Sequence, residues 1–356
     1  MTKILLIPDV HYCPTQFNGP GPDGVPQRLS ELNDSMDWAA RLGRKEGCDI
    51  SLQMGDFFDN PSRLSGREIV AAALAWSRFP GRRIVLRGNH DFNARYDASK
   101  IFSLCGNVYD EPSTVYLNES EAFLAFLPYI RDREEFQEKL DGLQKQAGGH
   151  GIEIKRYLFI HQPVEGFIDI DPSAVPLEWF DLDVWSAVYS GHYHETMGGK
   201  GIHYLGSLTN TAFVPKGRNK EKGVWVLDVA TGELVFHRNP HAPIMLTTTP
   251  AQLQEDSQGL DPAQTLLKLK YSDPQELQEL DWETVGKFRG STQRLIREDL
   301  SDELADEEVI PEIVSGKTAA DVLDAAKRSL DAELREDSQF MERFDALGRE
   351  RVLRIQ

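Results

Sequence analysis

Histidine, aspartate and asparagine recur at one kind of place in this 356-residue sequence, immediately after a short apolar run. The clearest case is LRGNHDF, where Asn89, His90 and Asp91 follow the apolar segment 83–86. An amide, an imidazole and a carboxylate in succession can bind a metal ion or take part in proton transfer. A Gly-Asn turn at the end of a strand has the same composition, so this stretch alone does not distinguish a site from a turn.

The same arrangement occurs four more times along the chain. Polar side chains follow the apolar runs 3–8, 49–54, 157–160 and 187–190, and together with the cluster at 89–91 they include five of the nine histidines. The clustered residues are Asp9, His11, Asp56, Asp59, Asn89, His90, Asp91, His161, His192 and His194. Any one histidine has a hydrogen-bonded structural role as an equal alternative. Burying the whole set together is costly unless cations neutralise it, so the set predicts a metal centre.

The elements that position these residues follow from the pattern between the clusters. The apolar runs are short, bounded by Gly and Pro and separated by helical patterns, which is typical of buried strands in an α/β sheet. We expect helices at 30–45, 65–79 and 131–147, and the second begins with a capping box of Ser65 and Glu68. All five clusters would then lie at the carboxyl ends of strands, where open α/β sheets place their sites.

Strand geometry also predicts the arrangement inside two clusters. Side chains alternate with a period of two along a strand, so Asp9 and His11 should point the same way, and His192 and His194 should do likewise. Each pair would then face an ion from one side.

After the last histidine pair the pattern changes to paired strands. The runs 223–228 and 233–236 are joined through a Gly-containing turn and predict a hairpin, which closes a first domain at 1–240. We expect a small α+β domain at 241–300. An acidic linker and C-terminal helices are expected at 301–356.

The two later segments can be described further. In the small domain we expect a strand at 265–271, a helix at 274–288 and a strand at 293–297. In the acidic segment the apolar spacing predicts two amphipathic helices, at 318–334 and 340–347.

The formal net charge is −18, and the acidic residues are concentrated in the last third of the chain. This argues against binding nucleic acid by overall charge, because that mode needs a basic surface that displaces counterions. It leaves room for local contacts. The loop 216–222 contains Lys216, Arg218, Lys220 and Lys222, which we expect either to contact a phosphate backbone or to form a solvated loop.

Two further features of composition concern the compartment. The sequence has no run of about 18 apolar residues and no signal-peptide pattern before its first apolar run, so we expect a cytoplasmic protein without a membrane segment. Cys13, Cys48 and Cys105 are widely spaced and predict reduced structural thiols.

The motifs, taken in order, resemble the complete motif set of the calcineurin-like metallophosphoesterases. They are Asp9-x-His11, Gly55-Asp56-x-x-Asp59, Gly88-Asn89-His90-Asp91, His161 and Gly191-His192-x-His194. Three additional features are similar to those of the SbcD nucleases of bacteria and phages: Pro61-Ser62, the stretch LPYIR at 127–131, and YLGS at 204–207 leading to Lys222. The resemblance covers the first domain.

This resemblance implies an αββα sandwich for the first domain, followed by the small α+β capping domain and a C-terminal helical segment. It implies a metal-dependent DNA exonuclease and endonuclease of repair and recombination, acting as a homodimer in the cytoplasm of a bacterium or a phage-infected host cell. It also implies a partner, an SbcC-like ATPase of the SMC family, bound through residues 315–356. The amphipathic helices expected there suit a helix-in-groove contact, with packing back on the small domain as the alternative.

The residue types also suggest roles in phosphodiester hydrolysis. Such a reaction needs a nucleophile, charge neutralisation and assistance to the leaving group, and two divalent ions supply the first two. The expected ligands are Asp9, His11 and His194 for one ion, Asn89, His161 and His192 for the other, and Asp56 for both. This mixture of nitrogen and oxygen donors suits manganese, with iron or zinc as alternatives.

His90 follows a ligand in sequence but has a separate expected role. We expect Asp91 to orient its imidazole and to favour the protonated form, which would stabilise the transition state or protonate the leaving oxygen. The family resemblance implies the same role for His90. Asp59 is expected to support a ligand, with helix capping as the alternative.

Three functions compete on these grounds. The favoured function is a manganese-dependent DNA nuclease. The alternative is a phosphatase or a cyclic-nucleotide phosphodiesterase with the same chemistry, and a non-catalytic scaffold is disfavoured by the intact set of ligands. The domain after residue 240 favours the nuclease, because a small-molecule hydrolase has no evident need of it.

Overall fold

The computed structural model of the chain describes residues 2–13, 26–118, 122–151, 153–168, 171–218, 220–277, 280–289 and 295–297. The chain divides into two compact units. Of the described residues, the first unit contains 2–13, 26–211 and 220–242, and the second contains 212–218 and those between 243 and 297. The helices expected at 318–334 and 340–347, and the partner-binding segment 315–356, lie outside the described residues.

The first unit contains two six-stranded sheets. One sheet has the order β13-β12-β1-β2-β3-β4. Its strands are β1 (Lys3–Ile7), β2 (Ile50–Gln53), β3 (Arg82–Leu86), β4 (Asn107–Tyr109), β12 (Gly223–Asp228) and β13 (Leu234–Arg238). The strands β1 to β4 are parallel, and β12 and β13 form the expected antiparallel hairpin on the edge beside β1.

The other sheet has the order β5-β6-β7-β8-β10-β9. Its strands are β5 (Ser113–Leu117), β6 (Ala122–Leu127), β7 (Lys155–Ile160), β8 (Ala187–Ser190), β9 (Thr196–Gly199) and β10 (Ile202–Leu205). The four central strands are parallel, and β5 and β9 are antiparallel edge strands.

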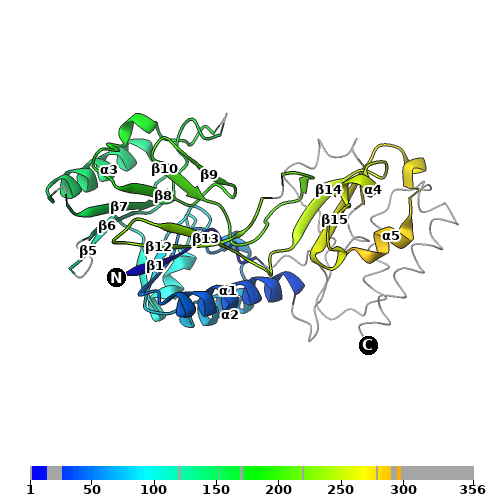
Figure 1. The fold of residues 1–356 in the computed structure, drawn as a ribbon, viewed down its shortest axis with the longest axis horizontal. Coiled ribbons are helices and arrows are strands. Elements are labelled where there is room, and N and C mark those ends of the chain that lie inside the picture. Colours follow the sequence, from blue (N-terminus) through cyan, green and yellow to red (C-terminus); the bar gives the residue numbers. More distant parts are fainter. Residues whose placement is uncertain are drawn as a thin grey trace. The chain divides into compact units, whose positions relative to one another are not determined.

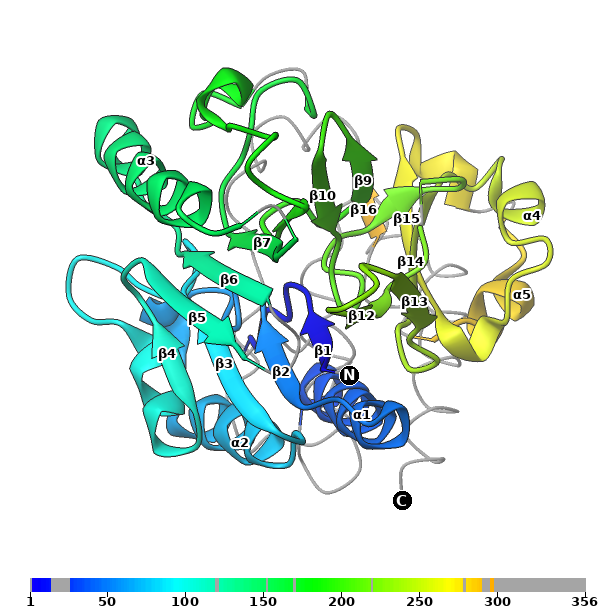
Figure 2. The same cartoon turned by 60° about the vertical axis from the view of Figure 1, so that its left-hand side comes forward.

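Helices cover the outer faces of both sheets, which confirms the αββα sandwich. The helices α1 (Gln27–Glu46) and α2 (Gly66–Ser77) lie on the far side of β1 and β12, whereas α3 (Arg133–Gly148) lies beside β6 and β7 (Figure 1). The strands β1 to β3 run side by side above α1 and α2 (Figure 2). Short 3-10 helices span Pro61–Arg63, Ala98–Leu104 and Leu177–Trp179.

Alternation along the strands explains the layering. In β1, Leu5 and Ile7 pack against α1 and α2, while Ile4 and Leu6 face the other sheet. The space between the sheets is filled by apolar side chains from both of them, such as Leu52 and Phe159. Apolar residues on both faces of each strand are what a sheet covered on both sides requires.

The helix α2 shows how local sequence sets one of these elements. The Ser65 hydroxyl accepts a hydrogen bond from the backbone N–H of Arg67, and the Glu68 carboxylate accepts one from the backbone N–H of Ser65. This reciprocal capping box satisfies N–H groups that have no partner inside the helix. The expected start of the helix is therefore confirmed, and the helix ends at Ser77, just ahead of Pro80-Gly81.

The second unit is a four-stranded sheet in the order β11-β14-β15-β16. Its strands are β11 (Val214–Pro215), β14 (Ile244–Thr248), β15 (Thr265–Tyr271) and β16 (Leu295–Arg297), with the helices α4 (Leu253–Asp256) and α5 (Trp282–Lys287) and 3-10 turns at Pro262–Gln264 and Pro274–Leu277. The single helix expected at 274–288 was wrong, because a 3-10 turn and the separate helix α5 occupy that range. No helix in the described part of the chain is long and apolar enough to cross a membrane.

Candidate metal centre

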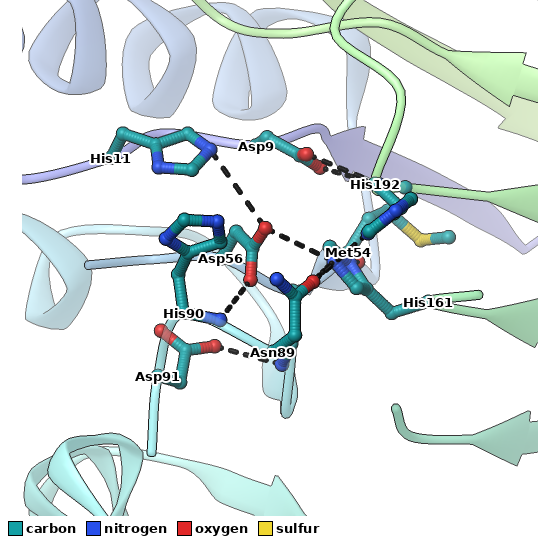
Figure 3. Close-up of polar contacts among 12 residues, drawn as sticks. Asp9, His11, Met54, Asp56, Asn89, His90, Asp91, His161 and His192 are labelled. Atoms are coloured by element: carbon teal, nitrogen blue, oxygen red, sulfur yellow. Dashed lines mark hydrogen bonds and ion pairs between the residues drawn. The ribbon is translucent and has the colours of Figure 1, made fainter. Parts of the chain in front are cut away.

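The polar clusters meet at the carboxyl ends of five strands. Three follow β1, β2 and β3 of one sheet, and two follow β7 and β8 of the other. The strand pattern placed all five clusters at one edge of a single α/β sheet. In the structure they come from two sheets that face each other. Parallel strands in each sheet end at a common edge, so the layered fold brings the clustered residues from five loops together. Figure 3 labels all of them except Asp59 and His194.

One group of donors comes from the loops after β1 and β8. The Nε2 atoms of His11 and His194 lie 2.9 Å apart. The carboxylate Oδ2 of Asp9 lies 3.5 Å from Nε2 of His194. Asp9 and His11 are buried, and His194 is half-buried. These three side chains can each offer one atom to a single ion.

A second group comes from the loops after β2, β3, β7 and β8. The Nε2 atom of His161 lies 3.1 Å from Oδ2 of Asp56 and 3.1 Å from Oδ1 of Asn89. The Nδ1 atom of His192 lies 2.9 Å from the same Asn89 oxygen. Asp56, His161 and His192 can together hold an ion, and the Asn89 oxygen lies among them.

Asp56 lies between the two groups. Its Oδ2 is 3.8 Å from Nε2 of His11 and 3.1 Å from Nε2 of His161, and the close-up shows the carboxylate between these rings (Figure 3). Its other oxygen accepts a hydrogen bond of 2.8 Å from the backbone N–H of His90. The carboxylate expected to be shared by two ions is thus the one that contacts both groups.

The backbone adopts a strained conformation at three of these positions. His11, Asp56 and His192 have φ angles of 56°, 52° and 82°, in the left-handed region that is unfavourable for residues with a Cβ atom. The alternation argument does not apply to these pairs, because β1 ends at Ile7 and β8 at Ser190. Asp9 and His11 nevertheless enter one group, as expected, whereas the expectation for His192 and His194 was wrong. Side-chain direction in the loops is set by these φ angles rather than by a period of two, and His192 and His194 enter different groups.

Glycines beside the donors allow the loops to approach each other closely. A Cβ atom on Gly88 would lie 2.2 Å from Oδ1 of Asp56, and one on Gly55 would lie 2.1 Å from Nδ1 of His161. Such distances are far inside van der Waals contact. Gly55 also has a φ of 100°, so it is required both for space and for conformation.

The donor chemistry requires positive charge at the centre. The Nδ1 atom of His161 lies 2.8 Å from the carbonyl oxygen of Met54 and donates its proton there. The Nε2 atom then faces the oxygens of Asp56 and Asn89, both of which are acceptors. An imidazole nitrogen among oxygen acceptors is stable only with a proton or a metal ion between them. The residues present therefore fit a divalent cation.

The electrostatics indicate the same requirement. Burial raises the pKa of Asp9 to about 7. Burial lowers the pKa of His161, but the Asp56 carboxylate outweighs it and the resulting pKa is about 9. Burial and the neighbouring His11 hold the pKa of His194 well below its ordinary value, which keeps this imidazole neutral. Without a cation the carboxylates of this buried cluster depend on protons for neutralisation, and a metal ion replaces those protons.

His90 and Asp91 are placed differently from the sequence expectation. The Nδ1 atom of His90 lies 2.5 Å from the backbone carbonyl of Asp59, and the ring is exposed. Asp91 is fully buried and accepts hydrogen bonds from the backbone N–H groups of Phe58 and Gly88. The expectation that Asp91 orients His90 was wrong, because the Asp91 carboxylate ties the loops after β2 and β3 together.

Asp59 contacts both neighbouring histidines. Its carboxylate Oδ1 lies 3.4 Å from Nδ1 of His11, and its carbonyl oxygen is the partner of His90. The cap of the following 3-10 helix is Asn60. The capping alternative for Asp59 was therefore wrong.

Two outer partners of the histidines were missed in the sequence. Asp171 lies with Oδ2 3.8 Å from Nε2 of His192 and accepts a hydrogen bond from the hydroxyl of Tyr193. Thr211 lies with Oγ1 2.7 Å from Nδ1 of His194. Neither residue stands at the end of a predicted strand, so no signal of the kind used for the other positions marks them.

The four basic residues of the loop 216–222 differ in their exposure to solvent. Lys222 is only 7% exposed, and its ammonium group donates to the backbone carbonyl of His194, so its expected exposure to a phosphate backbone was wrong. Lys216, Arg218 and Lys220 are exposed. Lys216 donates to the carbonyl of Glu255, and Lys220 forms an ion pair of 3.1 Å with Glu195.

The chain matches a known protein family over more than half of its length. A family model described as calcineurin-like phosphoesterase matches residues 2–207. These residues include all the donors of both groups and the loops that carry them. No curated protein matches the chain.

Solved structures with similarity to the chain include an archaeal phosphodiesterase and a dimetal phosphatase from Danio rerio. The first is 13% identical, has a TM-score of 0.35, and is matched over 67% of this chain and 99% of its own. The second is 13% identical, has a TM-score of 0.41, and is matched over 68% of this chain and 96% of its own. A protein from Thermus thermophilus is 12% identical with a TM-score of 0.41, over 67% and 98% of the two chains.

Proposed function

The chain belongs to the calcineurin-like phosphoesterase family, and from that premise we propose that it hydrolyses phosphodiester bonds of DNA with the help of two divalent metal ions. The observation that carries this proposal is the convergence of two nitrogen–oxygen donor groups on the shared carboxylate of Asp56. Two adjacent cation sites that share a carboxylate are the arrangement used for in-line displacement at phosphorus.

The ligands follow from the two groups. Asp9, His11 and His194 would hold one ion, Asn89, His161 and His192 the other, and Asp56 both. When bound, the ions supply an activated nucleophile and neutralise charge on the phosphoryl oxygens. Manganese suits this mixture of imidazole, carboxylate and amide donors, because selectivity follows ligand type and geometry.

The side chain of His90 acts beside these ligands. Its Nδ1–H donates to the carbonyl of Asp59, which orients the ring and leaves Nε2 for the substrate. The exposed ring can hold a proton at Nε2 and give it to the leaving oxygen, or stabilise charge on the phosphoryl group. The backbone N–H of the same residue donates to Asp56, so backbone and side chain serve different partners.

The choice of DNA as substrate rests on the features similar to the SbcD nucleases, including LPYIR at 127–131 and the segment leading to Lys222. Exposed Arg218 and Lys220 are candidate contacts to the phosphate backbone. The alternative substrates are phosphomonoesters and cyclic nucleotides, which the same metal chemistry can hydrolyse.

One experiment distinguishes these substrates. Purified protein with Mn²⁺ is incubated with linear duplex DNA, single-stranded DNA, a cyclic dinucleotide and a phosphomonoester, with the Asp56→Asn variant as a control for contaminating nucleases. We expect metal-dependent cleavage of DNA that the variant lacks. Activity confined to the small molecules would contradict the nuclease and favour the alternative.

We further propose a homodimer and an SbcC-like ATPase of the SMC family as partner, bound through residues 315–356. The acidic run at 302–308, which precedes this segment in the sequence, would steer it to a basic surface in a salt-dependent way. Deleting 315–356 should leave cleavage by the isolated protein nearly intact and abolish co-purification with the ATPase. Retention of the ATPase at full affinity would contradict this assignment.

A further inference from the structure

We propose that Thr211 is a positioning residue, which fixes the ring of His194 so that Nε2 faces the ion held with Asp9 and His11. This inference rests on the proposed metal-dependent function and adds a residue to its machinery. The observation behind it is the 2.7 Å distance between Oγ1 of Thr211 and Nδ1 of His194.

The protonation pattern of the ring gives this contact its meaning. A neutral imidazole carries one proton, and a nitrogen that binds a cation cannot carry it. The Nε2 atom of His194 lies 2.9 Å from Nε2 of His11 and 3.5 Å from Oδ2 of Asp9, so Nε2 is the ligand atom. The proton therefore resides on Nδ1, and the Thr211 hydroxyl accepts the hydrogen bond from it. With Nε2 on the ion, the hydroxyl acts as the acceptor of the Nδ1 proton and holds the ring in the orientation that binds metal.

The backbone around Thr211 is firmly held, as a positioning residue requires. The guanidinium of Arg28, which is 3% exposed, donates to Oγ1 of Thr209 at 2.8 Å and to the carbonyl of Asn210 at 3.0 Å. The hydroxyl of Ser207 donates to the carbonyl of Thr209 at 2.8 Å. Arg28 belongs to α1, so these hydrogen bonds attach the segment that leads to Thr211 to that helix.

The backbone of His194 is held separately. Its carbonyl oxygen accepts a hydrogen bond from the buried ammonium of Lys222, and the oxygen of the Ser207 hydroxyl lies 3.3 Å away. With the main chain anchored by these contacts, the remaining freedom of His194 is rotation of the side chain. The hydroxyl of Thr211 restricts this rotation from the Nδ1 side of the ring, while His11 contacts the Nε2 side.

Thr211 can be tested directly, in contrast to the partner of His161. The partner of His161 is the main-chain carbonyl of Met54, which no substitution removes. Thr211→Val keeps the shape of the side chain and removes the acceptor, whereas Thr211→Ser keeps the acceptor and removes a methyl group. Thr231→Val is the matched control, because it removes a hydroxyl that accepts from the backbone N–H of Glu233 in the turn between β12 and β13.

The experiment measures Mn²⁺ binding to the full-length protein by isothermal titration calorimetry and by electron paramagnetic resonance. We expect the wild type and Thr231→Val to bind two ions with a spin-coupled signal. In Thr211→Val one ion should bind about 10- to 100-fold more weakly, with the coupled signal replaced by that of a single ion at low Mn²⁺. Thr211→Ser should restore both ions.

Each outcome is decisive. Two ions bound by Thr211→Val with wild-type affinity and coupling would overturn the role of Thr211 while leaving the proposed function intact. Failure of Thr211→Ser to restore binding would show that the methyl group, and not the acceptor, is what matters, and would also overturn it. A wild-type protein that binds no Mn²⁺ would overturn the proposed function and this inference together.

Discussion

Replacing His90 by asparagine separates metal binding from turnover. The backbone N–H of His90 donates to Oδ1 of Asp56 at 2.8 Å, and this bond persists whatever the side chain. The imidazole itself contacts the carbonyl of Asp59 and is exposed, with its centroid 5.1 Å from that of His11. The ring of His90 lies in a third group of possible donors with His11 and Asp59, but in neither of the two groups that meet at Asp56. We therefore expect His90→Asn to retain two Mn²⁺ ions.

The expected loss lies in kcat. Loss of a positioned general acid costs about 10²- to 10⁴-fold, which corresponds to roughly 2.7 to 5.5 kcal/mol of barrier at 25 °C. An asparagine at position 90 can still donate a hydrogen bond but cannot transfer a proton, so we expect kcat on DNA to fall by at least about 100-fold. KM should change little, because the proton moves only in the transition state.

The assay compares two substrates with different leaving groups. DNA has a poor alkoxide leaving group that needs protonation, whereas bis(p-nitrophenyl) phosphate releases a stable phenolate. A larger loss on DNA than on the nitrophenyl ester identifies general acid catalysis, and equal losses identify charge stabilisation instead. His203→Asn is the control, because His203 is an exposed histidine on β10. Loss of Mn²⁺ from His90→Asn by elemental analysis, or an unchanged kcat, would refute the reasoning.

Three further outcomes follow from the structure. Asp56→Asn should weaken Mn²⁺ binding, measured by calorimetry, by more than the roughly 10- to 100-fold expected for the loss of an outer partner. The reason is that Oδ2 of Asp56 lies 3.8 Å from Nε2 of His11 and 3.1 Å from Nε2 of His161, so it contacts both donor groups. Gly191→Ala would place a Cβ atom 2.5 Å from the carbonyl oxygen of Met54 and 2.7 Å from Oδ1 of Asp9, so stability in urea should fall by about 1–3 kcal/mol and Mn²⁺ binding should weaken. Ser65→Ala removes the cap of α2 and should lower the free energy of unfolding by about 1 kcal/mol, measured by urea denaturation, without changing Mn²⁺ content. Unchanged values in any of these variants would contradict the corresponding contact.

Local sequence determined the elements whose signals are local. The capping box of Ser65 and Glu68 specified the start of α2, because both partners lie within four residues of each other. The apolar runs specified the strands that precede the polar clusters, since a strand buried on both faces is predominantly apolar. The clusters were therefore recognisable before the fold was known. The Gly-containing turn between two apolar runs likewise predicted the hairpin of β12 and β13.

Only the tertiary structure decided how the clusters combine. Asp171 and Thr211 reach His192 and His194 from positions 21 and 17 residues away in the chain, and no spacing rule marks such pairs. Lys222 has the composition of an exposed basic loop, yet the anchoring of the His194 carbonyl buries it. The side-chain directions at His11, Asp56 and His192 come from positive φ angles. Sequence alone does not give these angles, because a residue with a Cβ atom adopts them only where surrounding contacts compensate the strain.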